Sequence, residues 1–282
     1  MTTARFRNGW IGILMAGMAL SGCAGADSVE RGDVNYENFT AEQIYERGEY
    51  DLSRNRPELA AGVFSEVERL YPYSEWAKRA LIMQAFAYHE SQDYENSRAA
   101  AQRFVDFYPT DEDAAYAQYL LAMSYYDQID EVGRDQKLTF KALQSLREVI
   151  ERYPDSEYAK SAVLKFDLAY DHLASKEMEV GRYYLKRSHF TAAINRFRIV
   201  VEDFQTTTHT AEALHRLVEA YLSLGLTDEA RTAGAILGYN FRGTEWYEDS
   251  YRLLTGRGLT LEAVGDNWLR KVYRQTIKGR WL

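Results

Sequence analysis

Apolar residues recur at helical spacing along most of this chain. The clearest stretch is Gly181–Phe204, in which a small residue precedes a turn and a second apolar run. Ala193, Phe197 and Val200 in that run are separated by four and three residues, so they share one face of a helix. The pattern predicts two helices joined by a turn near Ser188, with the small residue where the two helices meet.

The same skeleton occurs twice upstream, with identical offsets of 12, 16, 19 and 24 residues from the small residue. The copies are Gly48, Ala60, Phe64, Val67 and Pro72; Ala85, Ser97, Ala101, Phe104 and Pro109; and Gly181, Ala193, Phe197, Val200 and Gln205. A further copy, Ala122–Pro154, fits if about eight residues are inserted near Asp127–Lys137, and a fifth, around Ala220, is weaker. The chain therefore contains an internal repeat.

The repeat resembles the tetratricopeptide repeat, a helix–turn–helix unit of about 34 residues. A small residue on one helix lets the next approach, and a bulky residue fills the remaining groove. The resemblance implies an all-α fold: a right-handed solenoid of about five tetratricopeptide-like helix pairs plus a C-terminal helical extension. The alternative is a generic helical bundle that is rich in alanine.

Helix boundaries can be placed from capping residues and prolines. Thr40-Ala41-Glu42-Gln43 reads as a capping box that opens the first helix. Three later helix boundaries contain a Tyr-Pro pair, with Ser or Asp three residues after the Tyr. The proline ends one helix, and the Ser or Asp can cap the next. Ser156–Arg187 contains no proline and Gly181 is its single glycine, which predicts one long helix or two nearly continuous ones. Glu245–Leu254 and Leu261–Ile277 are two further predicted helices.

The first 22 residues read as a secretion signal: Arg5 and Arg7, then a short apolar run, then small residues. Leu20-Ser21-Gly22-Cys23 resembles the bacterial lipoprotein box, which implies cleavage before Cys23 and lipid on its sulfur; an ordinary signal with an incidental cysteine is the alternative. The predicted organisation is 1–22 signal peptide, 23–38 flexible tether, 39–241 repeat domain and 242–282 C-terminal helical extension. The extension is either a cap on the open end of the solenoid or a basic docking element.

Composition and charge exclude several function classes. The formal net charge is −8, whereas a nucleic-acid binder needs a basic stripe. The five histidines are scattered, no pair has the i,i+4 spacing of a helical metal site, and no phosphate loop or nucleophile elbow occurs. We therefore expect no enzyme activity, no cofactor and no metal.

The 22 tyrosines point instead to peptide binding. In the register of the repeat, one stripe of the first helix in each pair faces a concave groove, and aromatic side chains with a few charges suit an extended, partly apolar peptide. The alternative is that neighbouring helices cover these residues. The predicted groove residues are Tyr45, Arg79, Ile82, Phe86, Tyr116, Tyr119 and Tyr126.

The lipoprotein box, the polar tether and five repeats punctuated by Tyr-Pro together resemble the BamD family. That resemblance implies a lipoprotein anchored in the outer membrane and facing the periplasm, as a subunit of the β-barrel assembly machine. The implied partners are the POTRA domains of the barrel subunit, other assembly lipoproteins and the C-terminal segments of unfolded barrel proteins. Arg196, beside the packed Phe197, should point outward and contact an acidic partner. The rival is a repeat lipoprotein of another envelope system, such as a cell-wall synthesis coordinator or a secretin pilot.

Overall fold

The computed structural model of the chain describes residues 34–132, 134–265 and 267–277. The chain divides into two compact units, residues 1–36 and 37–282, and the α-helices of the described residues all lie in the second. No strand occurs in the described residues. The helices are α1 (Ala41–Ser53), α2 (Pro57–Leu70), α3 (Glu75–Glu90), α4 (Tyr94–Phe107), α5 (Ala114–Tyr126), α6 (Lys137–Arg152), α7 (Glu157–Lys186), α8 (Phe190–Asp203), α9 (Thr210–Ser223), α10 (Thr227–Asn240), α11 (Glu245–Thr255) and α12 (Trp268–Ile277), with a 3-10 turn at Tyr36–Asn38.

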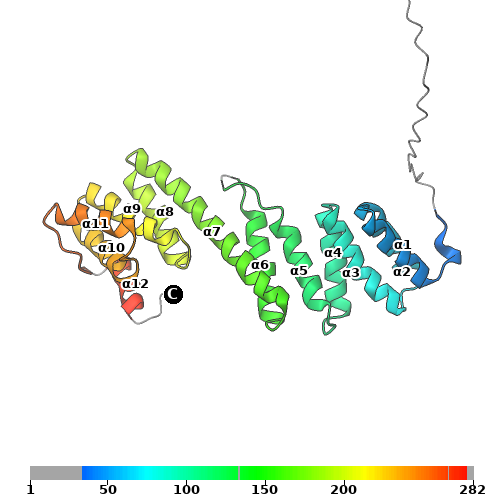
Figure 1. Ribbon diagram of the computed structural model, residues 1–282. Coiled ribbons are helices and arrows are strands. Elements are labelled where there is room, and N and C mark those ends of the chain that lie inside the picture. Colours follow the sequence, from blue (N-terminus) through cyan, green and yellow to red (C-terminus); the bar gives the residue numbers. More distant parts are fainter. Residues whose placement is uncertain (1–33, 133, 266, 278–282) are drawn as a thin grey trace, which may run out of the picture. The chain divides into compact units, whose positions relative to one another are not determined.

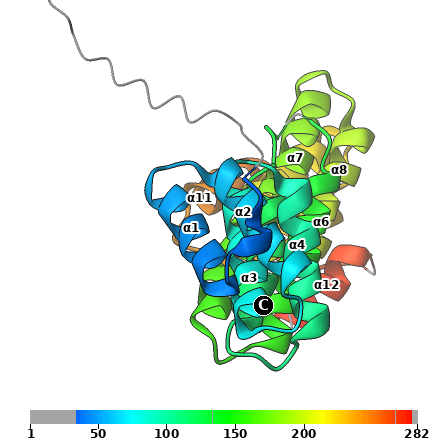
Figure 2. The same ribbon diagram turned by 90° about the vertical axis from the view of Figure 1, so that its right-hand side faces the viewer.

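Helices that follow one another in the chain pack against one another from α1 to α10 (Figure 1). The first helices of successive pairs also meet, because α1 contacts α3, α3 contacts α5 and α5 contacts α7. In the view turned by 90°, successive pairs overlap one behind another (Figure 2). Contacts restricted to neighbouring pairs define a helical repeat stack. The predicted all-α fold of tetratricopeptide-like pairs is confirmed.

Close packing within a pair depends on the small residue of the repeat. A Cβ built at Gly48 of α1 would lie 2.5 Å from Cε1 of Phe64 in α2, whose side chain is fully buried. Real Cβ atoms do not approach a ring so closely, so α1 and α2 can meet at this distance only with glycine. This is the packing that the offset of 16 residues predicts.

Capping side chains set the helix starts much as the sequence indicates. Thr40 and Gln43 form the predicted capping box of α1. The hydroxyls of Ser74 and Ser156 accept the backbone N–H groups of Ala77 and Ala159, at 3.1 and 3.0 Å. Asp111 differs: it accepts the N–H of Asp113 and pairs with Lys78 at 2.9 Å, and α5 begins only at Ala114.

Four of the turns inside the pairs share one backbone geometry. Their central residues are Asn55, Gln92, Ser188 and Gly225, with φ of 57, 62, 60 and 74°. In each turn this residue donates its N–H to the carbonyl three residues earlier, and the next residue donates to the carbonyl five residues before itself. The third pair departs from this pattern, since residues 127–136 lie between α5 and α6 as the predicted insertion.

The helix α7 is the longest of the described helices, with 30 residues. It begins after the cap Ser156 and ends before Arg187, so the prediction of one continuous helix is confirmed. Its N-terminal half packs on the third pair and its C-terminal half belongs to the fourth. At about 1.5 Å per residue it spans about 45 Å.

The C-terminal prediction is right for one helix and wrong for part of the other. Helix α11 begins at Glu245 as expected, but α12 begins at Trp268, not at Leu261. Gly265 has a φ of +75°, which an α-helix does not accommodate. Thr232 of α10 also engages this segment, because its hydroxyl accepts the N–H of Val264 at 3.1 Å. The single hydrogen of the hydroxyl is shared between the carbonyls of Asp228 and Val264, at 2.8 and 3.0 Å.

Both C-terminal helices pack on the last repeat. Helix α11 contacts α9 and α10, and α12 contacts α10 through the buried Leu269 and Val272. Covering the last pair is what a terminal cap of a solenoid does. Among the described residues, no helix combines the length and the apolar character that crossing a bilayer requires. The lipoprotein box with Cys23 lies outside the described residues.

Candidate functional site

The predicted groove residues lie on α1, α3 and α5, but two of them are buried. Tyr45 and Ile82 keep only 9% and 6% of their surface exposed. The Tyr45 ring packs between Phe64 and Trp76, with ring centroids 5.4 and 5.0 Å away. These two side chains therefore pack between the helices and leave almost no surface for a peptide to contact.

The C-terminal side of the predicted groove is closed by α7. The Tyr158 ring lies 5.1 Å from that of Tyr116 and 5.6 Å from that of Tyr119. Burial, followed by the nearby Tyr158, raises the pKa of Tyr116 to about 12. Tyr126 is half-buried, with the ammonium of Lys165 4.7 Å from its ring centre. The stripe on α5 thus rests largely against the next helix.

Two predicted residues on α3 keep accessible surface. Arg79 is exposed and its guanidinium lies 5.2 Å from the ring of Trp76, a cation–π contact. Phe86 is half-buried on the same helix. The structure therefore brings Tyr45, Trp76 and Arg79 together in one cluster. It brings Tyr116, Tyr119 and Tyr158 together in another.

Trp76 and Tyr158 belong to an aromatic set that the sequence interpretation missed. Each follows a capping residue and a glutamate, as does Trp246, in the triplets Ser74-Glu75-Trp76, Ser156-Glu157-Tyr158 and Thr244-Glu245-Trp246. In all three helices this ring lies against a side chain of the preceding first helix; for Trp246 that side chain is His215, at 5.5 Å. The recurring triplet of a capping residue, a glutamate and an aromatic residue could have identified this set from the sequence.

Arg196 lies on the half-exposed side of α8 and has an ion-pair partner within the chain. Its Nη1 is 3.0 Å from Oε2 of Glu177 on α7, and its side chain is 41% exposed. The neighbouring Phe197 is fully buried, whereas Asn195 is exposed. A guanidinium has five N–H donors, so the ion pair leaves donors for a second acceptor.

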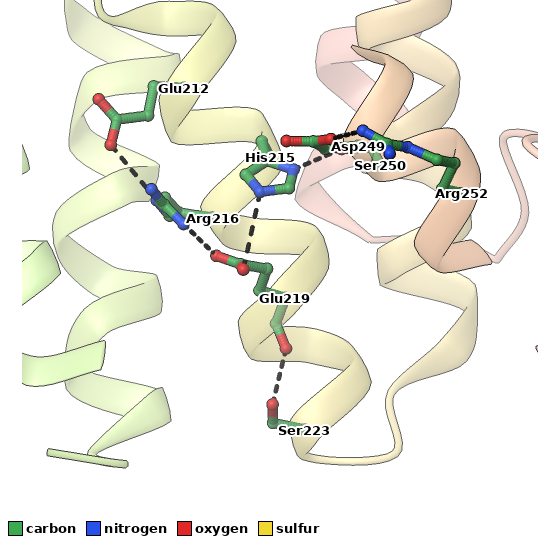
Figure 3. A network of polar contacts seen from close by, with 8 residues as sticks. All are labelled: Glu212, His215, Arg216, Glu219, Ser223, Asp249, Ser250 and Arg252. Atoms are coloured by element: carbon green, nitrogen blue, oxygen red, sulfur yellow. Dashed lines mark hydrogen bonds and ion pairs between the residues drawn. The ribbon is translucent and has the colours of Figure 1, made fainter. Parts of the chain in front are cut away.

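A network of charged side chains occupies the first helices of the last pairs. Arg216 of α9 donates to Glu219 at 2.7 Å and to Glu212 at 3.3 Å, and Glu212 also accepts Arg182 of α7 at 3.0 Å. The buried His215 contacts Ser250 of α11 through Nδ1 at 2.9 Å (Figure 3). These contacts join α7, α9 and α11.

The charge of Glu219 depends on this network. Partial burial opposes ionisation of its carboxyl, but His215 and Arg216 outweigh that effect and lower the pKa of Glu219 to about 2. Glu219 is therefore a carboxylate throughout the physiological range. Among the described residues no group of three or more His, Cys, Asp and Glu side chains is placed to hold a metal ion.

Known proteins resemble the chain over most of its length. A family model described as outer membrane lipoprotein, YfiO, matches residues 37–236. An outer membrane protein assembly factor BamD from Caulobacter vibrioides is 46% identical over 249 residues, covering 88% of this chain and 81% of the relative. The chain belongs to the BamD family.

Relatives from other organisms match the chain at lower identity. The BamD of Rickettsia prowazekii is 39% identical over 242 residues, which is 86% of this chain and 94% of that protein. The BamD of Neisseria meningitidis serogroup A is 28% identical over 235 residues, covering 80% and 88% of the two chains. Among solved structures, PilW, described as a widely conserved type IV pilus biogenesis factor, is 11% identical over 75% of this chain and 98% of its own, with a TM-score of 0.34. That TM-score is too low to bear on function.

Proposed function

We propose that this protein is a non-enzymatic lipoprotein of the machinery that assembles β-barrels in the outer membrane. It faces the periplasm, binds unfolded barrel proteins with its N-terminal pairs, and docks the POTRA domains of the barrel subunit with its C-terminal half. The observation that carries the proposal is the 46% identity, over 88% of the chain, with a protein named an outer membrane protein assembly factor. Other assembly lipoproteins are further partners.

The anchor is lipid attached to Cys23, after cleavage between Gly22 and Cys23. More than one acyl chain gives stable anchoring, whereas one chain binds only marginally. Mass spectrometry of the membrane-extracted protein tests this step. An acylated Cys23 at the N-terminus is the expected result, and an intact Met1 or an unmodified Cys23 contradicts it.

The substrate site is the accessible part of the predicted groove, centred on Arg79 and Phe86 of α3. A terminal barrel strand alternates apolar and polar residues, so side chains on one face recur at about 7 Å. Helices offer no free strand edge, so recognition depends on side-chain pockets and charge. Phe86 supplies apolar surface and Arg79 a cation, while Tyr45, Ile82, Tyr116, Tyr119 and Tyr126 hold the helices that present them.

Photocrosslinking with a peptide tests the groove. The peptide alternates apolar and polar residues, ends in an aromatic residue and carries a photoreactive group. Phe86→Ala should reduce crosslinking to α3 and α5 severalfold. Phe140→Ala is the control, because Phe140 is an exposed aromatic residue on α6. Equal crosslinking by Phe86→Ala and Phe140→Ala, with unchanged helix content, would remove Phe86 from the site.

Docking of the barrel subunit uses the half-exposed face of α8 around Arg196. Arg196→Glu removes a cation and repels Glu177, so this variant alone confounds docking with folding. The double variant Arg196→Glu with Glu177→Arg restores an ion pair between α7 and α8 while keeping the reversal at position 196. If Arg196 contacts the partner, co-purification of the barrel subunit should fall in the double variant as well. Recovery in the double variant would limit Arg196 to a structural role.

A further inference from the structure

Successive helix pairs are joined along one edge of the stack. The turns from α2 to α3, from α4 to α5 and from α6 to α7 lie on this edge, at the bottom of Figure 1, whereas the turn from α1 to α2 lies on the opposite edge. Lys78, just after the first of these turns, pairs with Asp111 of the second at 2.9 Å. The hydroxyl of Tyr153 in the third turn donates to the carbonyl of Pro109 at 3.4 Å. These contacts hold the turns side by side, and we call residues 71–74 and 107–113 the joining edge.

The chain enters its folded body at the joining edge. Helix α1 begins at Ala41, and the hydroxyl of Tyr71 donates to the carbonyl of Phe39, just before that start, at 2.5 Å. The lipid anchor proposed at Cys23 lies sixteen residues before Phe39 in the sequence. At ~3.3–3.6 Å per residue, this stretch of chain can span at most about 60 Å. The joining edge is therefore the part of the body that the shortest stretch of chain links to the anchor.

Two aromatic rings stand exposed at the joining edge. Tyr73 has a relative exposure of 101% and Phe107 one of 66%. Within the part of the chain that the structure describes, Tyr73 makes no ring contact, and Phe107 meets the ring of Tyr108 edge-on, at 6.4 Å. Tyr50, an exposed tyrosine on α1, differs because two arginine side chains lie over its ring. Folding thus leaves the apolar surface of Tyr73 and Phe107 in water, although burial would be favourable.

The charges beside the two rings are mainly acidic. The side chain of Glu75 is 88% exposed and lies 3.8 Å from Lys78, whose ammonium is closer to Asp111. Asp106 and Glu112, near the second ring, are exposed as well. A partner of this edge must therefore place cationic groups next to an apolar layer.

A bilayer of zwitterionic lipids fits this pattern. Its ammonium groups lie outermost, above the phosphates and the hydrocarbon, so carboxylates can meet cations while rings reach apolar surface. Aromatic side chains gather at the membrane–water interface, where an apolar body and a polar end are both accommodated. A surface rich in anionic lipids would repel the same acidic edge.

We propose that Tyr73 and Phe107 insert into the headgroup region of a zwitterionic membrane, as a second membrane contact beside the lipid on Cys23. The proposal rests on the proposed acylation of Cys23, which keeps the joining edge within reach of the bilayer. In the third turn Asp155 takes the position of Tyr73, so the contact is limited to the first two turns. Contact at this edge orients the stack, with the turn from α1 to α2 pointing away from the membrane.

Fluorescence quenching in vesicles tests the contact. The mature lipoprotein is reconstituted in phosphatidylcholine vesicles that contain a lipid with a nitroxide on its headgroup. A nitrobenzoxadiazole fluorophore is attached through Thr110→Cys or Ser53→Cys; Cys23 is the one native cysteine, and its acylation leaves the introduced thiol to react. Thr110 is exposed on the joining edge, and Ser53 is exposed at the end of α1, towards the opposite edge. Quenching at position 110 should exceed that at position 53 severalfold, and equal quenching would overturn the proposal.

Removal of the two rings tests whether they hold the edge at the membrane. Tyr73→Ala with Phe107→Ala, in the Thr110→Cys background, should lower quenching to the value at position 53. Phe140→Ala with Tyr183→Ala is the matched control, because it removes two rings that are 61% and 50% exposed on α6 and α7. The control should leave the quenching at position 110 unchanged. Equal quenching in the two double variants, with unchanged helix content, would contradict the role of Tyr73 and Phe107.

The composition of the vesicles tests the choice of lipid. Adding anionic phosphatidylglycerol should reduce quenching at position 110, since the acidic edge is repelled, and added salt should restore it by screening. Stronger quenching on anionic vesicles would contradict the preference for zwitterionic headgroups.

Flotation of the same vesicles separates failure of the contact from failure of the anchor. Protein that floats with the vesicles and is quenched equally at positions 110 and 53 has the anchor without the contact. Protein that does not float with the vesicles has neither, and both the acylation of Cys23 and the contact would then be wrong.

Discussion

Gly181 of α7 lies directly against the ring of Phe197 of α8. A Cβ built at position 181 would be 2.8 Å from Cδ1 and Cζ of Phe197 and closer still to Cε1. Phe197 is fully buried, so its ring has no free space to move into. The pair repeats the contact between Gly48 and Phe64 in the first repeat, at the same offset of 16 residues.

Alanine at position 181 should therefore destabilise the fourth pair despite its higher helix propensity. Overpacking a core typically costs about 1–3 kcal/mol, which exceeds the propensity gain of about 1 kcal/mol. Gly62→Ala on α2 is the control, because no atom lies within 4 Å of its added Cβ; it should be neutral or stabilising. Urea denaturation compares the free energies of unfolding. Equal stability of Gly181→Ala and the unmodified chain would refute the close-packing account.

Proline at position 175, in the middle of α7, should break the link between the third and fourth pairs. Ser175→Pro removes a backbone hydrogen bond inside the helix and costs about 3 kcal/mol or more. Glu157→Pro should be tolerated, because Glu157 is the first residue of α7 and the preceding Ser156 has the extended conformation that precedes proline. Thermal unfolding followed by circular dichroism measures both. A similar midpoint for the two variants would argue against a continuous structural helix.

Glycine at position 92 should stabilise the turn between α3 and α4. Gln92 has a φ of 62°, a left-handed conformation that costs a non-glycine residue about 1–2 kcal/mol. Part of the gain is lost to the greater chain entropy of glycine, so Gln92→Gly should gain about 0.5–1 kcal/mol. Gln92→Ala keeps the strain and should gain nothing. Chemical denaturation that ranks alanine above glycine would contradict the turn geometry.

Acid should weaken the network around Glu219. The native pKa of Glu219 is about 2 and its usual value 4.5, so the native state binds fewer protons than the unfolded state between these two pH values. The stability that Glu219 contributes is therefore fully present above pH 4.5 and is lost as the pH falls towards about 2. With about a third of the side chain exposed, the loss should be on the order of 1 kcal/mol. In Glu219→Gln this part of the pH dependence should vanish, whereas Glu179→Gln, at an exposed site on α7, should retain it.

The repeat architecture could be predicted because it depends on periodic residues. The offsets from Gly48, Ala85 and Gly181 predict which residues meet between the two helices of a pair. The structure has such contacts, for example between Gly48 and Phe64. The extent of α7 followed from the lack of proline and glycine before Gly181, together with the cap at Ser156. Local signals of this kind act on the backbone whatever its neighbours are.

The functional surface was harder to predict, because periodicity places a residue on a face without naming what covers that face. Tyr45 and Ile82 are on the expected stripe, yet Trp76 and the packing of α3 bury them. The ion pair joins Arg196 of α8 to Glu177 of α7, and neither residue is one of the small and bulky residues that define the repeat. The helix start expected at Leu261 failed because Thr232, on another helix, competes for the backbone of Val264.

One crosslinking measurement tests most directly the claim that this protein serves β-barrel assembly. A photoreactive residue replaces the exposed Asn195, next to Arg196, in the full-length lipoprotein. After irradiation in native membranes, mass spectrometry identifies the crosslinked protein. The account predicts an outer-membrane barrel protein with periplasmic POTRA domains. Capture of a secretin or a cell-wall synthase instead would contradict it.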